Sequence, residues 1–248
     1  MTAQLAVSSA LYHPGPVVAV DAAASLWPGL ARRLPLRQAG REVDWCQLWR
    51  LLDAGDGVAV VRSMLHETRH VEFGRSLPGR QSWITRLGGS AHPQPFATIS
   101  PDELLRVLHL SAQACRVTFV DCAADMHVLT RVCATVADVL VVVCRADADE
   151  LRRCACLVEL LAVDTRTDLS SKAVIVPVQH RPGKWPHAAA AAEAAAGDAV
   201  AGVMRMPYDS RLARSCHSVM GSRTARHTAT QLAATVALLA RQSHWRSV

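Results

Sequence analysis

Short apolar runs that alternate with helical patterns constrain the fold of this chain more than any other feature. The runs occupy residues 17–21, 117–121, 139–144, 173–178 and 203–206. Continuous apolar runs bounded by turn signals are typical of strands buried on both faces of a parallel sheet. Strands that alternate with helices in this way predict an α/β fold, a mostly parallel sheet with helices on both faces.

Helical spacing of apolar residues fills most of the intervals between these runs. A short amphipathic helix is expected over residues 2–12, and Ser100 and Pro101 mark a clear helix start that continues to about Gln113. Further helices are expected at 126–136, 148–162, 187–197 and 224–241. Residues 45–53 also have helical spacing, residues 58–61 fit either a strand or a helix, and residues 74–99 form an irregular connection with a strand around Trp83.

The composition favours a globular protein of the cytoplasm. The chain has 248 residues, of which 50% are hydrophobic and 19% are charged, enough to form one sizeable core. Neither a signal peptide nor an apolar run of transmembrane length is visible, so no transmembrane segment is expected. The 8 cysteines include no CxxC pair, and this spacing argues against a zinc site.

Asp21 and Asp121 are the sharpest chemical candidates, because each ends an apolar run. Ligands of parallel sheets bind at the carboxyl ends of the strands. A carboxylate there could hold a Mg²⁺-bound water beside a phosphate, or it could cap the following turn.

The net charge of +6 has two explanations: a surface for acidic partners such as DNA, or an Arg-rich composition with solvated helix faces. The basic residues that could form such a surface near the C-terminus are Arg211, Arg214, Arg223 and Arg226.

Several segments together resemble the MinD/ParA family of P-loop ATPases. They are GPVVAVD from Gly15, VTFVDCAAD from Val117, KAVIVPVQHRPG from Lys172 and VMRMPYDSRLARS from Val203. The resemblance covers nearly the whole chain, so we expect one domain over residues 1–248, with an insertion-like irregular region at about 62–99. It lies in the order of the segments, since no single stretch is diagnostic alone.

The resemblance implies ATP and Mg²⁺ as cofactors and assigns a role to particular residues. Asp21 and Asp121 would be catalytic, and Asp121 would also be the metal-binding carboxylate. Gln179 stands where the family often uses Asn to bind adenine, and Pro207, Tyr208 and Asp209 resemble the turn that contacts it. The family also implies a homodimer or a partner protein.

The chain departs from the family at the phosphate loop. Residues 2–6 (TAQLA) look like those immediately after the GKT ending of that loop, and no GxxxxGK[ST] occurs elsewhere. Asp125 replaces the usual glycine, and Ala22 follows Asp21. With the first strand and the phosphate loop absent, we expect a truncated or degenerate ATPase of the partitioning, positioning or secretion type, with impaired ATP binding. The alternative is a non-enzymatic adaptor that dimerises without nucleotide.

Overall fold

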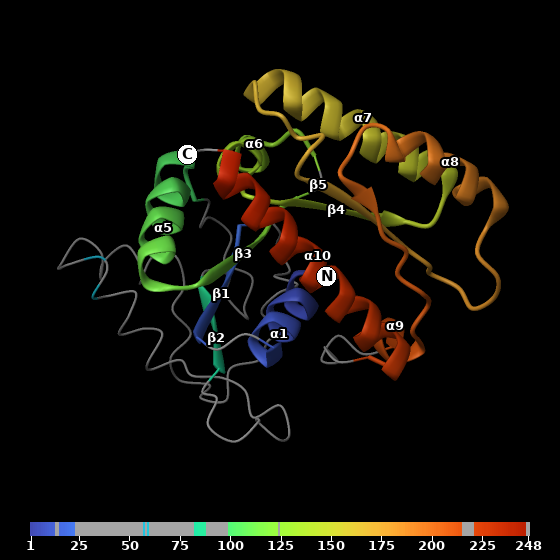
Figure 1. Cartoon of the computed structure of the whole chain (residues 1–248), viewed down its shortest axis with the longest axis horizontal. Helices are drawn as coiled ribbons and strands as arrows, with labels where there is room; N and C mark the ends of the chain where they lie inside the picture. Colours follow the sequence, from blue (N-terminus) through green and yellow to red (C-terminus); the bar gives the residue numbers. More distant parts are fainter. Residues whose placement is uncertain are drawn as a thin grey trace. The chain divides into compact units, whose positions relative to one another are not determined.

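The computed structural model describes residues 1–12, 15–22, 57, 59, 82–87, 99–123, 125–214 and 221–246. These residues divide into two compact units, one up to Ala123 and the other from Asp125 onward. Each unit has a three-stranded sheet of its own (Figure 1). Whether they make up the single domain expected from the sequence stays a prediction.

The first unit is built on a parallel sheet with strand order β2-β1-β3. Its elements are α1 (Thr2–Tyr12), β1 (Gly15–Asp21), β2 (Ser82–Leu87), α5 (Pro101–Ala114) and β3 (Val117–Asp121). Helix α1 packs against all three strands, and α5 packs against β3 (Figure 1). The central strand β1 is buried from Val17 to Asp21. Since successive side chains point to opposite faces, both faces of this strand are covered.

Helix α1 is confirmed in position, but its predicted amphipathic character is wrong. The polar Gln4, Ser8 and Ser9 are buried together with apolar neighbours such as Leu5 and Val7. Small side chains allow this helix to pack closely on more than one side, so its polar residues do not mark a solvent face.

A complete capping box begins helix α5. The Ser100 Oγ accepts a hydrogen bond from the Glu103 N–H at 3.3 Å, and a Glu103 carboxylate oxygen accepts one from the Ser100 N–H at 2.7 Å. The two bonds satisfy backbone donors that a helix start otherwise leaves unpaired. Leu104 and Val107 then face the core.

The second unit has a parallel sheet with strand order β4-β5-β6. Its elements are α6 (Val128–Val136), β4 (Leu140–Arg145), α7 (Ala148–Thr165), β5 (Ala173–Val178), α8 (His187–Gly197), β6 (Gly202–Val203), α9 (Ser210–Arg214) and α10 (Arg223–Arg246). Helix α7 packs on β4 and β5, and it also contacts α6 and α8.

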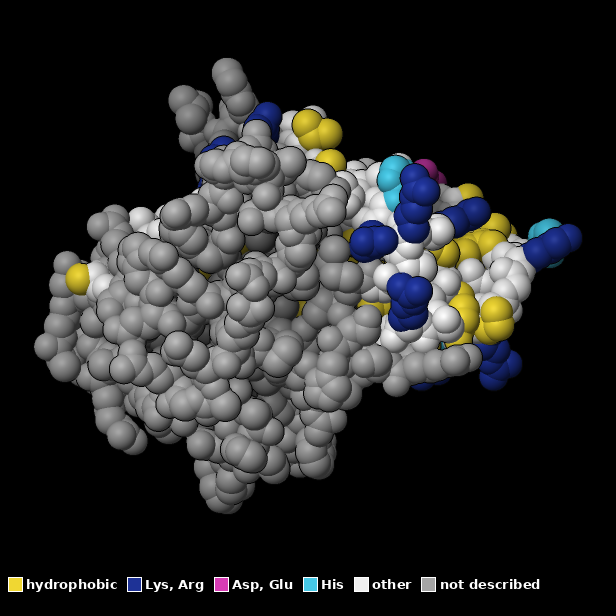
Figure 2. All heavy atoms as spheres, turned by 90° about the horizontal axis from the view of Figure 1, so that it is seen from below, with side chains coloured by type: hydrophobic (Ala, Val, Ile, Leu, Met, Phe, Trp, Pro, Cys, Tyr) yellow, Lys and Arg dark blue, Asp and Glu magenta, His cyan; other side chains and the backbone are white. Residues whose placement is uncertain are grey.

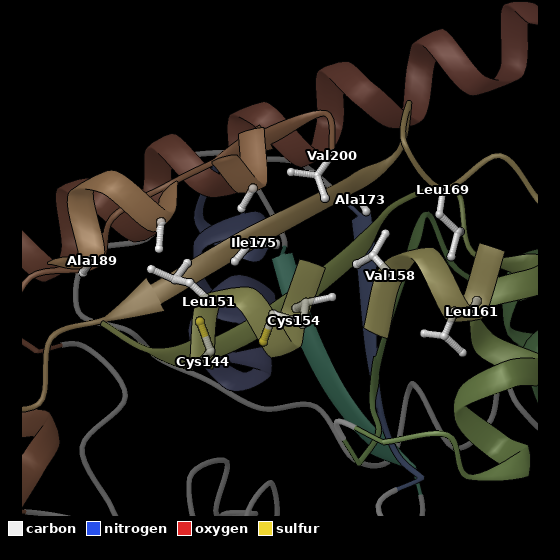
Figure 3. Close-up of a cluster of buried hydrophobic side chains, with 14 residues drawn as sticks. Cys144, Leu151, Cys154, Val158, Leu161, Leu169, Ala173, Ile175, Ala189 and Val200 are labelled. Carbon is white, nitrogen blue, oxygen red and sulfur yellow. The ribbon is translucent and has the colours of Figure 1, made fainter. Parts of the chain in front are cut away.

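The core of the second unit lies between α7, α8 and the sheet (Figure 3). Leu151, Val158 and Leu161 come from one side of α7, and Ile175 comes from β5. Cys144 of β4 and Cys154 of α7 belong to the same cluster. Central strand β5 is buried from Ala173 to Pro177, so both of its faces are covered as well.

The described strands are parallel, and the predicted α/β class is confirmed. The strands predicted at 117–121 and 173–178 match β3 and β5, and β2 contains Trp83. The strand predicted at 203–206 is wrong in length, because β6 ends at Val203 and only Met206 pairs again, in an isolated bridge with Val178. The short helix α9 was not predicted. The predictions for 45–53 and 58–61 lie outside the described residues, apart from the single position Ala59.

Candidate functional site

Asp21 and Asp121 lie side by side at the carboxyl edge of the first sheet. Strands β1 and β3 are neighbours, and the two aspartates are partners in their register. The Ala22 N–H donates to the Asp121 carbonyl oxygen at 2.9 Å, which continues the pairing past the strand ends. Asp21 is only 2% exposed, whereas Asp121 is half-buried. The structure therefore brings together the two carboxylates that the sequence singled out.

Thr2 completes this group, although it was not among the site residues predicted from the sequence. Its hydroxyl donates to Oδ1 of Asp121 at 2.8 Å, which joins the start of α1 to the end of β3. Thr2 is the first residue of α1, so the Asp121 carboxylate lies at the amino-terminal end of an 11-residue helix. Helix amino-terminal ends carry free N–H groups and a partial positive charge, and they favour anions. A hydroxyl residue at the start of a helix was the available signal in the sequence.

The donor set at this edge fits Mg²⁺. A carboxylate oxygen and a hydroxyl oxygen lie within hydrogen-bonding distance, and both are hard ligands of the kind that Mg²⁺ takes. Among the described residues no group of three or more His, Cys, Asp or Glu could hold a metal. Mg²⁺ does not need such a cage, since it usually binds one or two protein groups together with water and phosphate oxygens. Thr2 and Asp121 would hold the ion, which would neutralise phosphate charge when bound.

The residue that replaces the family's glycine has a local structural role. The Asp125 Oδ1 accepts hydrogen bonds from the His127 N–H at 2.9 Å and from the Thr130 hydroxyl at 3.5 Å. Asp125 therefore holds the first turn of α6, within the second unit. A glycine could not make these side-chain bonds.

The Gln179 side chain closes the loop that follows β5 in the second unit. Its side-chain amide donates to the carbonyl oxygens of Gly183 at 2.9 Å and Lys184 at 3.4 Å, and its backbone N–H donates to that of Met206 at 2.9 Å. These bonds use the donor side of the amide. Its predicted role in binding adenine stays a prediction.

Asp209 joins the start of α9 to the start of α10. Oδ1 accepts from the Arg211 and Leu212 N–H groups at 2.8 and 3.0 Å, and Oδ2 accepts from the Ser222 N–H. Burial acts to raise the pKa of Asp209, but the hydrogen bonds from Ser222, Leu212 and Arg211 outweigh it and lower the pKa to about 2. The side chain thus has a structural role, while its predicted contact with adenine, like those of Pro207 and Tyr208, stays a prediction.

Close packing reinforces this junction. A Cβ at Gly221 would lie 3.1 Å from Asp209 Oδ2 and 3.1 Å from Leu212, and the Gly221 φ is +42°. Glycine is therefore favoured here both by space and by backbone conformation.

Arg205 connects the segments that follow β5 and β6. Its Nε lies 2.7 Å from a Glu193 carboxylate oxygen, and its guanidinium lies 5.0 Å from the centre of the Trp185 ring. The sequence alone does not predict this group, because an ion pair between a helix and a distant loop leaves no spacing signal.

Comparison with known proteins places the fold. No family model matches the sequence, and no curated protein matches it significantly. The structure is similar to the ParA family ATPase from Chlorobium tepidum TLS, with a TM-score of 0.67 and 16% identity over 94% of this chain and 91% of that one. It is also similar to a chain of the MinC:MinD cell division protein complex from Aquifex aeolicus, with a TM-score of 0.58 and 16% identity over 93% and 88% of the two chains. The chain therefore has a MinD/ParA-like α/β fold.

No helix in the described part of the chain is long and apolar enough to cross a membrane.

Proposed function

We propose that this chain is a MinD/ParA-like nucleotide-dependent switch in which Thr2 and Asp121 bind Mg²⁺ together with a phosphate group. The hydrogen bond between the Thr2 hydroxyl and Asp121 is the observation that carries the proposal. Phosphate-loop ATPases hold their Mg²⁺ with a loop Ser or Thr and an Asp at a strand end. Thr2, which the resemblance puts just after that loop, and Asp121 offer the same two kinds of oxygen ligand. The similar ParA family ATPase supports ATP as the nucleotide.

Asp21 is the proposed second catalytic carboxylate. It lies beside Asp121 in the register and is almost fully buried. From this position it would help to orient the attacking water or the shell of the metal ion. Gln179, Pro207, Tyr208 and Asp209 are the residues proposed to contact the adenine.

We expect the affinity for ATP to be low. The 248 residues contain no GxxxxGK[ST], and so no glycine-rich loop with lysine to surround the phosphates. Within the first unit, the metal ion and the start of α1 would remain as contacts of the phosphates.

Calorimetric titration of the purified chain with ATP tests both statements. With Mg²⁺ we expect weak binding in the millimolar range, and with excess chelator a further loss. The isosteric substitution Asp121→Asn should weaken the Mg²⁺-dependent part by at least roughly ten-fold, since ligand-shell changes typically cost that much. The matched control Asp198→Asn, at an exposed residue after α8, should bind like the native chain. A micromolar affinity for ATP would contradict the proposed weak binding. An affinity that changes neither with Mg²⁺ nor with Asp121→Asn would contradict the proposed site.

The second candidate is a non-enzymatic adaptor that dimerises without nucleotide. The MinC:MinD complex, an example of a similar fold in a protein assembly, supports this candidate. An adaptor would have the same mass in solution with and without Mg-ATP.

Nonspecific DNA binding is a third and separate proposal. Lys and Arg side chains are spread over the described part of the face in Figure 2, where acidic side chains are sparse. Arg211, Arg223 and Arg226 are exposed, while the side chain of Arg214 lies outside the described part. Phosphate contacts would make the affinity fall steeply between low and moderate salt. An affinity that stays flat over this range would exclude such binding.

A further inference from the structure

Two thiols meet in the core of the second unit. Cys144 lies near the carboxyl end of β4, and Cys154 lies on α7. The two side chains are close enough for one thiol to act on the other, and Figure 3 shows the two sulfur atoms side by side. Cys144 is 9% exposed and Cys154 is 7% exposed. Both residues are therefore buried, with a small part of each still exposed.

The surroundings of the pair are apolar, with acidic groups near it. Leu151, Val158 and Ile175 belong to the same cluster. The carboxylates of Glu150 and Glu193 are close enough to act electrostatically on Cys144, and Glu150 also acts on Cys154. Glu193 is itself paired with Arg205 at 2.7 Å. No other cysteine belongs to this buried cluster within the described residues.

We propose that Cys144 and Cys154 form a reversible disulfide when the protein meets a peroxide, which ties the end of β4 covalently to α7. The thiolate of Cys154 first attacks one peroxide oxygen, forms a sulfenic acid and releases hydroxide. The Cys144 sulfur then attacks the Cys154 sulfur, forms the S–S bond and releases water. The two thiols lose two electrons to the peroxide, and a dithiol reductant reverses the reaction.

The interaction between the two thiols decides which one reacts first. The interaction with Cys144 lowers the pKa of Cys154, although burial and Glu150 act against it. The same interaction, with burial, raises the pKa of Cys144. Cys115 offers a contrast, because burial alone raises its pKa to about 12. Thiolates are the nucleophiles in such exchanges, so Cys154 is the attacking residue and Cys144 the resolving one.

Peptide mapping of the native chain tests this directly. The chain is treated with hydrogen peroxide while folded, free thiols are alkylated, and the protein is digested with trypsin without reduction. Cleavage after Arg145 and Arg153 separates the fragments 132–145 and 154–166. The two linked peptides should appear at a mass about 2 Da below the summed masses of the separate peptides with Cys144 and Cys154 as free thiols, because two hydrogens are lost. Fragment ions then distinguish Cys144 from Cys133, and Cys154 from Cys156.

Two variants sharpen the result. The substitution Cys156→Ser, at an exposed thiol of the same helix, should keep the link, and Cys144→Ala should abolish it. In the native chain, oxidation should raise the melting temperature by a few degrees and dithiothreitol should restore it, since a disulfide constrains the unfolded chain. A link through Cys133 or Cys156, or oxidised cysteines in the folded chain without a Cys144–Cys154 link, would overturn the proposal. The result does not depend on whether the chain binds a nucleotide.

Discussion

At the scale of single residues, the hydroxyl of Thr2 is the group on which the proposed function depends most closely. Thr2→Val keeps the shape of the side chain and removes the oxygen that donates to Asp121 at 2.8 Å. We expect it to lower the Mg²⁺-dependent component of ATP binding at least roughly ten-fold, because one ligand of the ion is lost. Thr2→Ser keeps the hydroxyl and should bind within a few-fold of the native chain. Equal affinities for Thr2→Val and Thr2→Ser would show that the hydroxyl is not a ligand.

Asp209 leads to a prediction about stability and pH. In Asp209→Asn one side-chain oxygen becomes an NH₂ group, which cannot accept from the Ser222 N–H. The folded-state pKa of about 2 lies below the ordinary value of 3.8, so the carboxylate contributes its full stability above pH 3.8 and loses it as the pH falls through 2. At pH 7 the variant should be less stable by roughly 2 kcal/mol in chemical denaturation.

The difference between Asp209→Asn and the native chain should therefore shrink below pH 4 and nearly vanish near pH 2. The exposed Asp198→Asn serves as the control and should follow the native chain at each pH. A difference that stays constant with pH would mean that the charge of Asp209 contributes nothing.

At the scale of elements, the capping box of α5 is the clearest local determinant. Ser100→Ala removes the acceptor for the Glu103 N–H and should destabilise the protein by about 1 kcal/mol. Ser100→Asp restores an acceptor and a favourable charge at the helix start, so it should recover most of that loss. Denaturant unfolding of the two variants checks this, and equal stabilities would argue against a role for the cap.

The elements were predictable where local chemistry determines them. The apolar run 117–121 and the Ser100-Pro101 helix start both appear where expected, although β3 is half-buried along its length and not covered on both faces. Helix α9 was missed because its five residues have no periodicity and depend on Asp209. The role of Lys172 was not predictable either. Its ammonium group donates to the carbonyl oxygens of Ala134 and Ala137, at the end of α6, at 3.2 and 2.7 Å. These contacts join residues far apart in sequence, so no local pattern reports them.

The candidate site also contains residues that were predictable from the sequence and residues that were not. Asp21 and Asp121 were predictable because strand ends in a parallel sheet share one edge. The contact with Thr2 was not, since it depends on how α1 packs on the sheet. For Gln179 the residue type suggested a ligand for the base, whereas the structure shows that its amide also closes the loop to Gly183.

At the scale of the whole molecule, the MinD/ParA-like fold leaves two behaviours to distinguish. A nucleotide-dependent switch changes its association when Mg-ATP binds, because the ligand binds one state better than the other. An adaptor has one association state throughout. The two behaviours can be distinguished even if no hydrolysis of ATP is detected.

Light scattering of the purified chain in several millimolar ATP is the most direct test of the proposed switch, with Mg²⁺ in one sample and excess chelator in the other. The proposal predicts a mass close to that of one 26.7 kDa chain without Mg²⁺ and a shift toward twice that mass with it. Asp121→Asn should abolish the shift. A native chain with the same mass in both samples would contradict the switch, and a constant dimer would favour the adaptor.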